Sequence, residues 1–211
     1  MSGRRIAAFD FDGTLTQRDT LLPFLVHVCG ARRVARAVAD VAPVAARARL
    51  GRLEAELHHR DAVKERLLAA LLRGRPAAWL EGAGAAFAQT LPGRLRAPLV
   101  AQVAWHREVG HELVIVSASL GAYLRPFAVA QGFHHVIAVE LEADADGALT
   151  GALVGPNVRG PEKEVRLRAW LDGDEPDLLW AYGNSSGDRE LLAMADVPVW
   201  VDRRSHRAPA V

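Results

Sequence analysis

The hydrophobic positions of this chain repeat with two different periods. Short apolar runs predict buried strands at residues 4–10, 113–116, 136–139, 178–182 and 199–201. Elsewhere apolar side chains recur every three or four residues, which predicts helices at about 94–109, at 121–131, from 161 onward and at 189–195. Strands that alternate with helices indicate an α/β fold, a doubly wound parallel sheet with helices on both faces.

A long helical region follows the first predicted strand. From residue 21 to about 87 the sequence is rich in Ala, Leu, Val and Arg at helical spacing. Prolines and glycines predict the breaks between three or four helices: Pro23, Gly30, Pro43, Gly51, Gly74 and Pro76. The span is long for a simple crossover, so we expect a small helical cap at 18–87, inserted into a core formed by 1–17 and 88–211. A hairpin is predicted within 140–157, where Asp146-Gly147 separates two strand-like runs.

The composition fits a folded domain without a membrane span. The 211 residues, half of them hydrophobic, can form one substantial domain or a core with a small insert. No stretch reaches the ~18 uncharged apolar residues that cross a bilayer, and the N-terminus carries no signal-peptide pattern. The single cysteine, Cys29, excludes an internal disulfide framework and suits a reducing compartment, so we expect a cytoplasmic protein.

The charge is nearly neutral overall but unevenly distributed. The formal net charge is +1, yet residues 18–86 contain 12 basic and 7 acidic side chains, a net of +5, against a net of −4 elsewhere. The basic segment indicates either an anionic substrate or surface nearby, or a solvated helical face. Because aromatic and basic residues are not interleaved and the total charge is small, no nucleic-acid partner is expected. The sequence does not predict the oligomeric state.

Two carboxylates stand where the first predicted strand ends. Asp10 and Asp12 follow the apolar run at 6–9, and Gly13-Thr14 comes next. Carboxylates are costly at such a place unless they are used, and ligands of open α/β sheets bind at the carboxyl ends of the strands. One carboxylate can attack phosphorus, the other can transfer a proton, and both can lie near a hard cation. Gly13 allows a tight turn that presents backbone N–H groups to an anion.

Three further polar segments occupy comparable positions. Ser117, followed by Ala118, ends the strand at 113–116 and can hold phosphate oxygens. Lys163, one of only two lysines, lies in the first turn of a predicted helix and can neutralise an anion. Asn184 and Asp188 lie on a glycine-rich loop and offer oxygen ligands for Mg²⁺. Because strand ends of a parallel sheet share one edge, we expect the four segments to converge.

These four segments, in this order, resemble the motifs of the haloacid dehalogenase superfamily of phosphatases. The closest similarity is to subfamily IB, the phosphoserine-phosphatase-like branch with a small helical cap, and it covers nearly the whole chain. The resemblance implies a Rossmann-like core and a Mg²⁺-dependent phosphomonoester hydrolase. It implies that Asp10 is the nucleophile forming an aspartyl-phosphate, and that Asp12 is the acid and then the base. The implied phosphate-binding residues are Gly13, Thr14, Ser117, Ala118 and Lys163, and the implied metal ligands are Asp10, Asp12, Asn184 and Asp188.

One position departs from the pattern of this family. Many relatives have aspartate as the first ligand of the fourth motif, where this chain has Asn184. Asparagine retains a carbonyl oxygen for Mg²⁺ but removes one negative charge. We therefore expect weaker metal binding rather than loss of activity.

The substrate is predicted only as a class, a small phosphorylated metabolite such as a phosphoserine-like, sugar or lipid phosphate. Asp19 corresponds to an acidic position that contacts the substrate in this branch, and the shorter Asp resembles phosphatidylglycerophosphate phosphatases. Arg60 and Arg66 are candidate cap residues for a second anionic group, or simply surface arginines. The apolar run at 21–26 could contact a lipid surface peripherally, but packing inside the cap is the preferred interpretation. Two alternatives remain: a phosphotransferase of the same fold, and a weakly active or non-catalytic phosphate-binding module.

Overall fold

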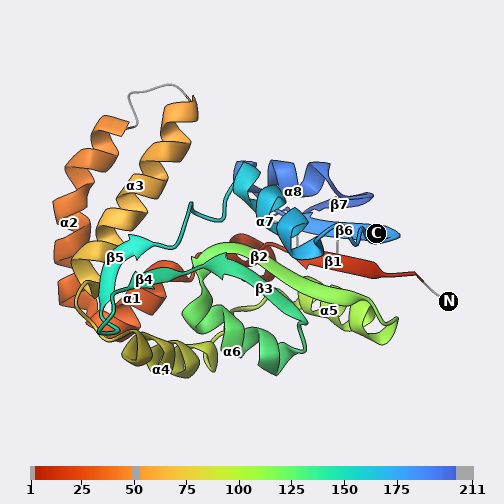
Figure 1. Ribbon diagram of the computed structural model, residues 1–211, viewed down its shortest axis with the longest axis horizontal. Helices are drawn as coiled ribbons and strands as arrows, with labels where there is room; N and C mark the ends of the chain where they lie inside the picture. The colour runs from red at the N-terminus through yellow and green to blue at the C-terminus, as the bar shows by residue number, and fades with distance from the viewer. Residues whose placement is uncertain (1–2, 49–52, 203–211) are drawn as a thin grey trace.

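A five-stranded parallel sheet forms the centre of the molecule, in the order β3-β2-β1-β6-β7 (Figure 1). This computed structural model describes residues 3–48 and 53–202, without the side chains of 43–48 and 53–60. The strands of the sheet are β1 (Arg5–Phe9), β2 (Glu112–Leu120), β3 (His135–Val139), β6 (Leu178–Gly183) and β7 (Val197–Trp200). The predicted α/β fold with a doubly wound parallel sheet is confirmed.

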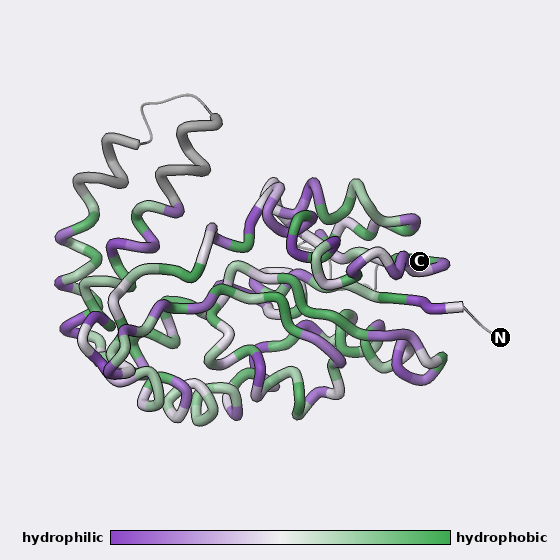
Figure 2. Tube along the Cα trace, viewed as in Figure 1, coloured by the Kyte–Doolittle hydropathy of each residue, from purple (hydrophilic) through white to green (hydrophobic). Residues whose placement is uncertain are grey.

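Helices cover both faces of this sheet. The helices α5 (Ala97–Glu108) and α6 (Gly121–Gln131) lie on one face, and α7 (Pro161–Leu171) and α8 (Arg189–Ala193) lie on the other. The central strands are therefore shielded from water on both sides. Figure 2 shows that hydrophobic residues predominate along them. Residues 6–9 of β1 and 113–116 of β2 are completely buried, as expected for continuous apolar runs in a parallel sheet.

The strand order reverses direction next to β1. The chain passes from β1 to β2 and β3 on one side, and then crosses to β6 and β7 on the other side. Such a switch point leaves a crevice at the carboxyl ends of the two strands that diverge, here β1 and β6. The segments after Phe9 and Gly183 therefore lie side by side at this edge.

A helical layer extends from one end of the sheet (Figure 1). It contains α1 (Leu21–Cys29), α2 (Ala31–Ala48), α3 (Leu53–Leu72) and α4 (Ala77–Ala88), and α4 packs on α6. The predicted hairpin forms from β4 (Leu141–Ala143) and β5 (Leu149–Leu153), and β5 packs on α3. Backbone bonds from Gly74 N to Leu149 O and from Ala77 N to Gly147 O attach the hairpin to the helices. The cap boundaries at 18 and 87 stay a prediction.

Some predicted boundaries were wrong. Pro23 does not break a helix, since it lies in the first turn of α1, where backbone N–H groups have no partner within the helix. Helix α2 continues through Pro43, although proline has no N–H for the helical hydrogen bond at that position, and it lies beside α3. Strand β2 extends beyond residue 116 to Leu120, with an irregular register between Val116 and Leu120.

The apolar run at the start of α1 is divided between interior and surface. Phe24 and Leu25 are fully buried, whereas Leu22 is 46% and Val26 is 40% exposed. Part of the run is thus buried, with Phe24 packed against Phe87 of α4 and Tyr123 of α6. Packing inside the cap and a peripheral lipid contact both stay predictions. Among the helices in the described parts of the chain, none has the length and apolar character that a bilayer crossing requires.

Candidate active site

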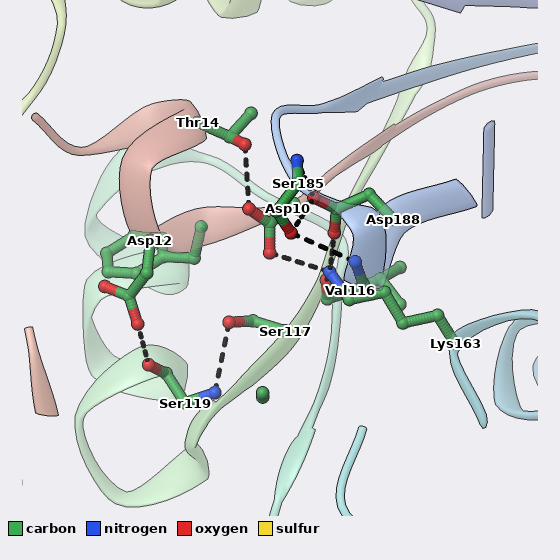
Figure 3. Close-up of polar contacts among 12 residues, drawn as sticks. Asp10, Asp12, Thr14, Val116, Ser117, Ser119, Lys163, Ser185 and Asp188 are labelled. Atoms are coloured by element: carbon green, nitrogen blue, oxygen red, sulfur yellow. Dashed lines mark hydrogen bonds and ion pairs between the residues drawn. The ribbon is translucent and has the colours of Figure 1, made fainter. Parts of the chain in front are cut away.

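The four polar segments meet at one edge of the sheet, as Figure 3 shows for Asp10, Ser117, Lys163 and Asp188. They surround a cavity of about 410 Å³, within the usual size range of small-molecule sites. The cavity is lined by Asp10, Asp12, Asp19, Ser117, Ala118, Arg159, Lys163, Asn184, Ser185, Ser186, Gly187 and Asp188. Side chains separated by more than 170 residues in sequence therefore share one site.

The ammonium of Lys163 connects three of the segments. Its Nζ donates to Asp10 Oδ1 at 2.7 Å, to Asp188 Oδ1 at 2.7 Å and to the backbone oxygen of Val116 at 2.8 Å. The side chain is only 2% exposed, so the three donors of the ammonium are all used inside the protein. This buried cation fixes the positions of two carboxylates relative to β2.

Burial and charge act in opposite directions on these three groups. Burial lowers the pKa of Lys163, but Asp10 and Asp188 outweigh it and raise that pKa above its ordinary value. Burial also opposes ionisation of Asp188, yet the Lys163 ammonium and hydrogen bonds keep its pKa low. For Asp10 burial dominates and raises the pKa, with Asp188 adding to it, while Lys163 and Thr14 favour the carboxylate.

The turn after β1 holds Asp10 from its other side. The hydroxyl of Thr14 donates to Asp10 Oδ2 at 2.7 Å, and Thr14 is completely buried. The turn that brings Thr14 back to Asp10 requires Gly13, because its φ of +80° disfavours any residue with a side chain. The amide of Gly13 donates to Thr16 Oγ1 at 3.3 Å. Both oxygens of Asp10 are thus oriented before any ligand binds.

Asp12 lies in a separate network of hydroxyl groups. Its Oδ1 accepts from both the N–H and the hydroxyl of Thr20, at 2.9 and 2.7 Å, and its Oδ2 accepts from the hydroxyl of Ser119. Tyr123 OH lies 3.1 Å from Thr20 Oγ1. Burial, followed by repulsion from Asp19, raises the pKa of Asp12 to about 7. A carboxyl with such a pKa can both donate and accept a proton near neutral pH.

The irregular end of β2, residues 117–119, contributes a compact polar wall. Ser117 is 1% exposed, and its hydroxyl accepts from the Ser119 amide at 3.1 Å. Ser117 and Ala118 line the cavity, as the proposed phosphate contact requires.

The loop after β6 is organised by Asp188. Its Oδ2 accepts from Asn184 N at 3.0 Å, from Ser185 N at 2.9 Å and from Ser185 Oγ at 2.8 Å. A Cβ on Gly183 would lie 2.5 Å from the Cβ of Asp188, so only glycine allows the approach. The side-chain amide of Asn184 points at the backbone oxygen of Asp12, with Nδ2 3.3 Å away. The first and fourth motifs therefore face each other directly.

The cavity offers oxygen ligands and an excess of negative charge. Four carboxylates line it, from Asp10, Asp12, Asp19 and Asp188, against two cationic side chains, Arg159 and Lys163. Among the side chains that the structure describes, those of 3–42 and 61–202, no three from His, Cys, Asp or Glu are arranged to hold a metal ion. A hard cation would therefore also use the Asp12 carbonyl and the Asn184 amide, which are oxygen donors of the kind Mg²⁺ prefers. These oxygen donors fit Mg²⁺. The positive charge of the ion would also offset the carboxylates of the cavity when an anionic substrate binds.

The predicted substrate residues differ in their placement. Asp19 lines the cavity and also accepts from Leu21 N at 3.0 Å, so it also binds the N-terminus of α1. Arg66 is exposed on α3 and is not among the residues lining the cavity. The side chain of Arg60 lies outside the described residues.

Several residues of the site were missed by sequence reasoning. Thr20 and Ser119 bind Asp12, Arg159 lines the cavity, and Lys64 and Asn157 bind each other at its edge. A signal was available for the last two, because both residue types are rare. The sequence has two lysines, Lys64 and Lys163, and two asparagines, Asn157 and Asn184. Nothing in the sequence distinguishes Thr20 or Arg159 from similar residues elsewhere.

Known proteins are similar to this chain in sequence and in fold. A model of the haloacid dehalogenase-like hydrolases matches residues 7–193. Protein CicA of Caulobacter vibrioides is 38% identical over 198 residues, which cover 90% of this chain and 83% of that protein. A phosphoserine phosphatase of Halobacterium salinarum is 33% identical over 202 residues, covering 93% and 85%.

Two solved structures add to this comparison. A protein of unknown function from Bordetella pertussis Tohama I superposes with a TM-score of 0.76 at 27% identity, covering 94% of this chain and 90% of that one. A phospho-aspartyl intermediate analogue of phosphoserine phosphatase superposes with a TM-score of 0.62 at 18% identity, covering 92% and 84%, a likeness of fold alone.

The fold, an α/β fold with a parallel sheet, is that of a hydrolase. The chain belongs to the haloacid dehalogenase-like hydrolase family, in its phosphoserine-phosphatase-like branch.

Proposed function

We propose that this protein is a Mg²⁺-dependent phosphomonoester hydrolase that works through an aspartyl-phosphate at Asp10. The observation that carries the proposal is the position of Asp10, held by Lys163 Nζ at 2.7 Å and Thr14 Oγ1 at 2.7 Å in a cavity shared with Asp12. A carboxylate fixed from both sides is oriented for attack, which removes part of the entropic barrier.

The chemistry follows from two carboxyl groups with different surroundings. Asp10 forms a bond to phosphorus while the bond from phosphorus to the alcohol oxygen breaks, and Asp12 gives that oxygen a proton. In the second half, Asp12 takes a proton from water, the water oxygen bonds to phosphorus, and the bond to Asp10 breaks. Phosphate leaves and both groups return to their starting states. The pKa of Asp12, about 7, suits both proton transfers.

We propose that Mg²⁺ is held by the Asp10 carboxylate, the Asp12 carbonyl and the Asn184 amide oxygen. When bound, it supplies positive charge that reduces repulsion between Asp10 and the substrate phosphate. Asp188 is better suited to orienting than to ligation, since its Oδ2 accepts three hydrogen bonds and its Oδ1 accepts from Lys163. Ser117, Ala118 and Lys163 line the cavity and would contact the phosphoryl group. Gly13 and Thr14, the other predicted phosphate-binding residues, do not line it: the Gly13 amide donates to Thr16 and the Thr14 hydroxyl to Asp10, so their role would be to hold Asp10 in place.

The substrate we propose is a small organic phosphate. A cavity of about 410 Å³ accommodates a metabolite of modest size, and similar proteins are named phosphoserine phosphatase and histidinol-phosphatase. Asp19 at the cavity wall offers a carboxylate for a cationic substituent. A reducing, cytoplasmic setting agrees with the single free cysteine.

Hydrolysis of p-nitrophenyl phosphate tests the proposal. We expect turnover with added MgCl₂ and its loss, at least about 100-fold, after removal of divalent ions with EDTA. Acid quenching of a reaction with ³²P-labelled substrate should trap label on the protein. Product analysis with added glycerol distinguishes water from an alcohol as the acceptor. Turnover without Mg²⁺, or no turnover at all across a panel of phosphorylated metabolites, would contradict the proposal.

Asn184→Asp is expected to bind Mg²⁺ as tightly as the wild type or more tightly. The substitution adds a negative charge to a proposed ligand and keeps its size. The measurement is the Mg²⁺ concentration that gives half-maximal turnover. The control is Gln89→Glu, which adds the same charge at an exposed amide at the end of α4, outside the proposed metal shell. A higher half-maximal Mg²⁺ concentration for Asn184→Asp than for the wild type would show that the proposed ligand set is wrong.

A further inference from the structure

Lys64 joins the cap to the core at the edge of the cavity. It lies on α3, and its Nζ donates to the backbone oxygen of Ala118 and to Asn157 Oδ1, the latter at 2.6 Å. Ala118 belongs to the end of β2 that lines the cavity, and Asn157 precedes the loop that leads to Lys163. One cap side chain therefore binds two separate core segments that carry site residues.

The amide of Asn157 is fixed from both ends. Its Nδ2 donates to Asp61 Oδ1 at 2.6 Å, and Asp61 lies three residues before Lys64 on the same side of α3. Because the amide oxygen faces an ammonium and the amide nitrogen faces a carboxylate, only one orientation of the amide satisfies both partners. Asn157 is 7% exposed, so water competes little for these bonds.

The contact at Ala118 reaches the proposed acid through the backbone. The carbonyl of Ala118 and the N–H of Ser119 belong to one planar peptide unit, so fixing the carbonyl fixes that N–H. The N–H of Ser119 donates to Ser117 Oγ at 3.1 Å, and the hydroxyl of Ser119 donates to Asp12. The hydrogen bond from Lys64 to Ala118 therefore helps to fix both Ser117 and Ser119 at the end of β2.

The charge of Lys64 is held in an acidic environment. Burial lowers its pKa to about 8, against the opposing effect of Asp61 and Glu65 on α3 and of Asp12 and Asp19 across the cavity. The end of β2 at 117–119 presents only neutral groups, and Arg159 lies two residues beyond Asn157. The ammonium therefore loses its proton as the pH rises through about 8, which weakens both of its hydrogen bonds.

We propose that Lys64 is a positioning residue, which holds the cap on the core and orders the irregular end of β2 at 117–119 for catalysis. The inference rests on the proposed function, because that function assigns this segment to the phosphoryl group. The cap is then required for the geometry of the core site, in addition to any contact it makes with substrate.

Lys64→Met is the test, with p-nitrophenyl phosphate and MgCl₂. We expect kcat to fall about 10- to 100-fold while KM changes less than about threefold, because positioning acts on the transition state. Asn157→Ala should lower kcat similarly, and the double variant should be little worse than Lys64→Met, since both remove one connection. The decline in wild-type kcat that centres near pH 8 should be absent in Lys64→Met. Arg36→Met, which removes an exposed cap cation on α2, is the matched control with unchanged kcat.

Three outcomes would overturn the inference. They are a kcat of folded Lys64→Met within threefold of the wild type, a rise in KM at unchanged kcat, or an additive double variant. If Lys64→Met does not fold, an unchanged kcat in Asn157→Ala would overturn the inference in its place. A wild type without turnover would contradict the proposed function instead, and hydrogen exchange then decides: faster exchange at 117–119 in Lys64→Met than in Arg36→Met supports the inference, and equal exchange overturns it.

Discussion

Asp10→Asn is expected to reduce kcat for p-nitrophenyl phosphate by roughly 10⁴-fold or more, because an amide oxygen is a far weaker nucleophile than a carboxylate. The fold should persist. Asparagine has nearly the same shape, and Lys163 Nζ still has Asp188 Oδ1 at 2.7 Å as its charged partner. Since burial already disfavours the charge of Asp10, we expect a free energy of unfolding within about 1 kcal/mol of the wild type. Steady-state kinetics and urea unfolding measure both effects.

Asp172→Asn is the matched control for that prediction. Asp172 is exposed at the end of α7 and has a φ of +50°, a left-handed conformation that asparagine also tolerates. It should leave both kcat and stability unchanged. Activity of Asp10→Asn above about 1% of the wild type, after exclusion of deamidation by mass spectrometry, would mean that another group attacks phosphorus.

Lys163→Met is expected to lose both activity and stability. The substitution leaves Asp10 and Asp188 buried without their cation, and breaking a buried ion pair in this way costs about 3–5 kcal/mol. Turnover should fall together with stability, because neither carboxylate keeps its orientation. Urea unfolding of the variant and of Arg168→Met measures the difference. Arg168 is an exposed cation on the same helix with ion pairs to Glu164 and Glu175 at the surface, and its loss should cost less than about 1 kcal/mol.

The stability loss of Lys163→Met should depend on pH in a defined direction. Without the ammonium, burial raises the pKa values of Asp10 and Asp188 in the folded state above the ordinary value of about 3.9. The folded variant then binds more protons than the unfolded chain, so its stability is greatest below pH 4 relative to the wild type and falls as the pH rises toward 7. If the difference in the free energy of unfolding between Lys163→Met and the wild type does not change with pH, the lost stability comes from packing instead.

Much of this site could be predicted because its residues follow local patterns. Asp10, Ser117 and Asn184 each come after an apolar run, and Lys163 follows a proline that starts a helix. In a parallel sheet such positions share one edge whatever the details of packing. The structure brings Asp10, Lys163 and Asp188 within hydrogen-bond distance of one another. The helical insert after β1 could be predicted for the same reason, from period and breaks alone.

The remaining features depend on contacts between distant segments. Thr20 binds Asp12 only because α1 begins beside the turn after β1. The use of Asp188 to orient the loop is visible only from its hydrogen bonds, since the sequence shows a carboxylate and not its partners. The irregular extension of β2 to Leu120 was equally invisible, because the serines at 117 and 119 indicate a turn by composition.

The sequence by itself determined the order of the strands and helices, the chemical groups of the site and the edge of the sheet at which they gather, because periodicity and strand ends are local properties. Only the tertiary structure decided how those groups are paired. The buried bridge at Lys163, the pKa of Asp12 near 7 and the connection of Lys64 to Ala118 and Asn157 all arise from burial and from distances across the fold. Desolvation and hydrogen bonding vary over a few ångströms, and no spacing along the chain specifies them.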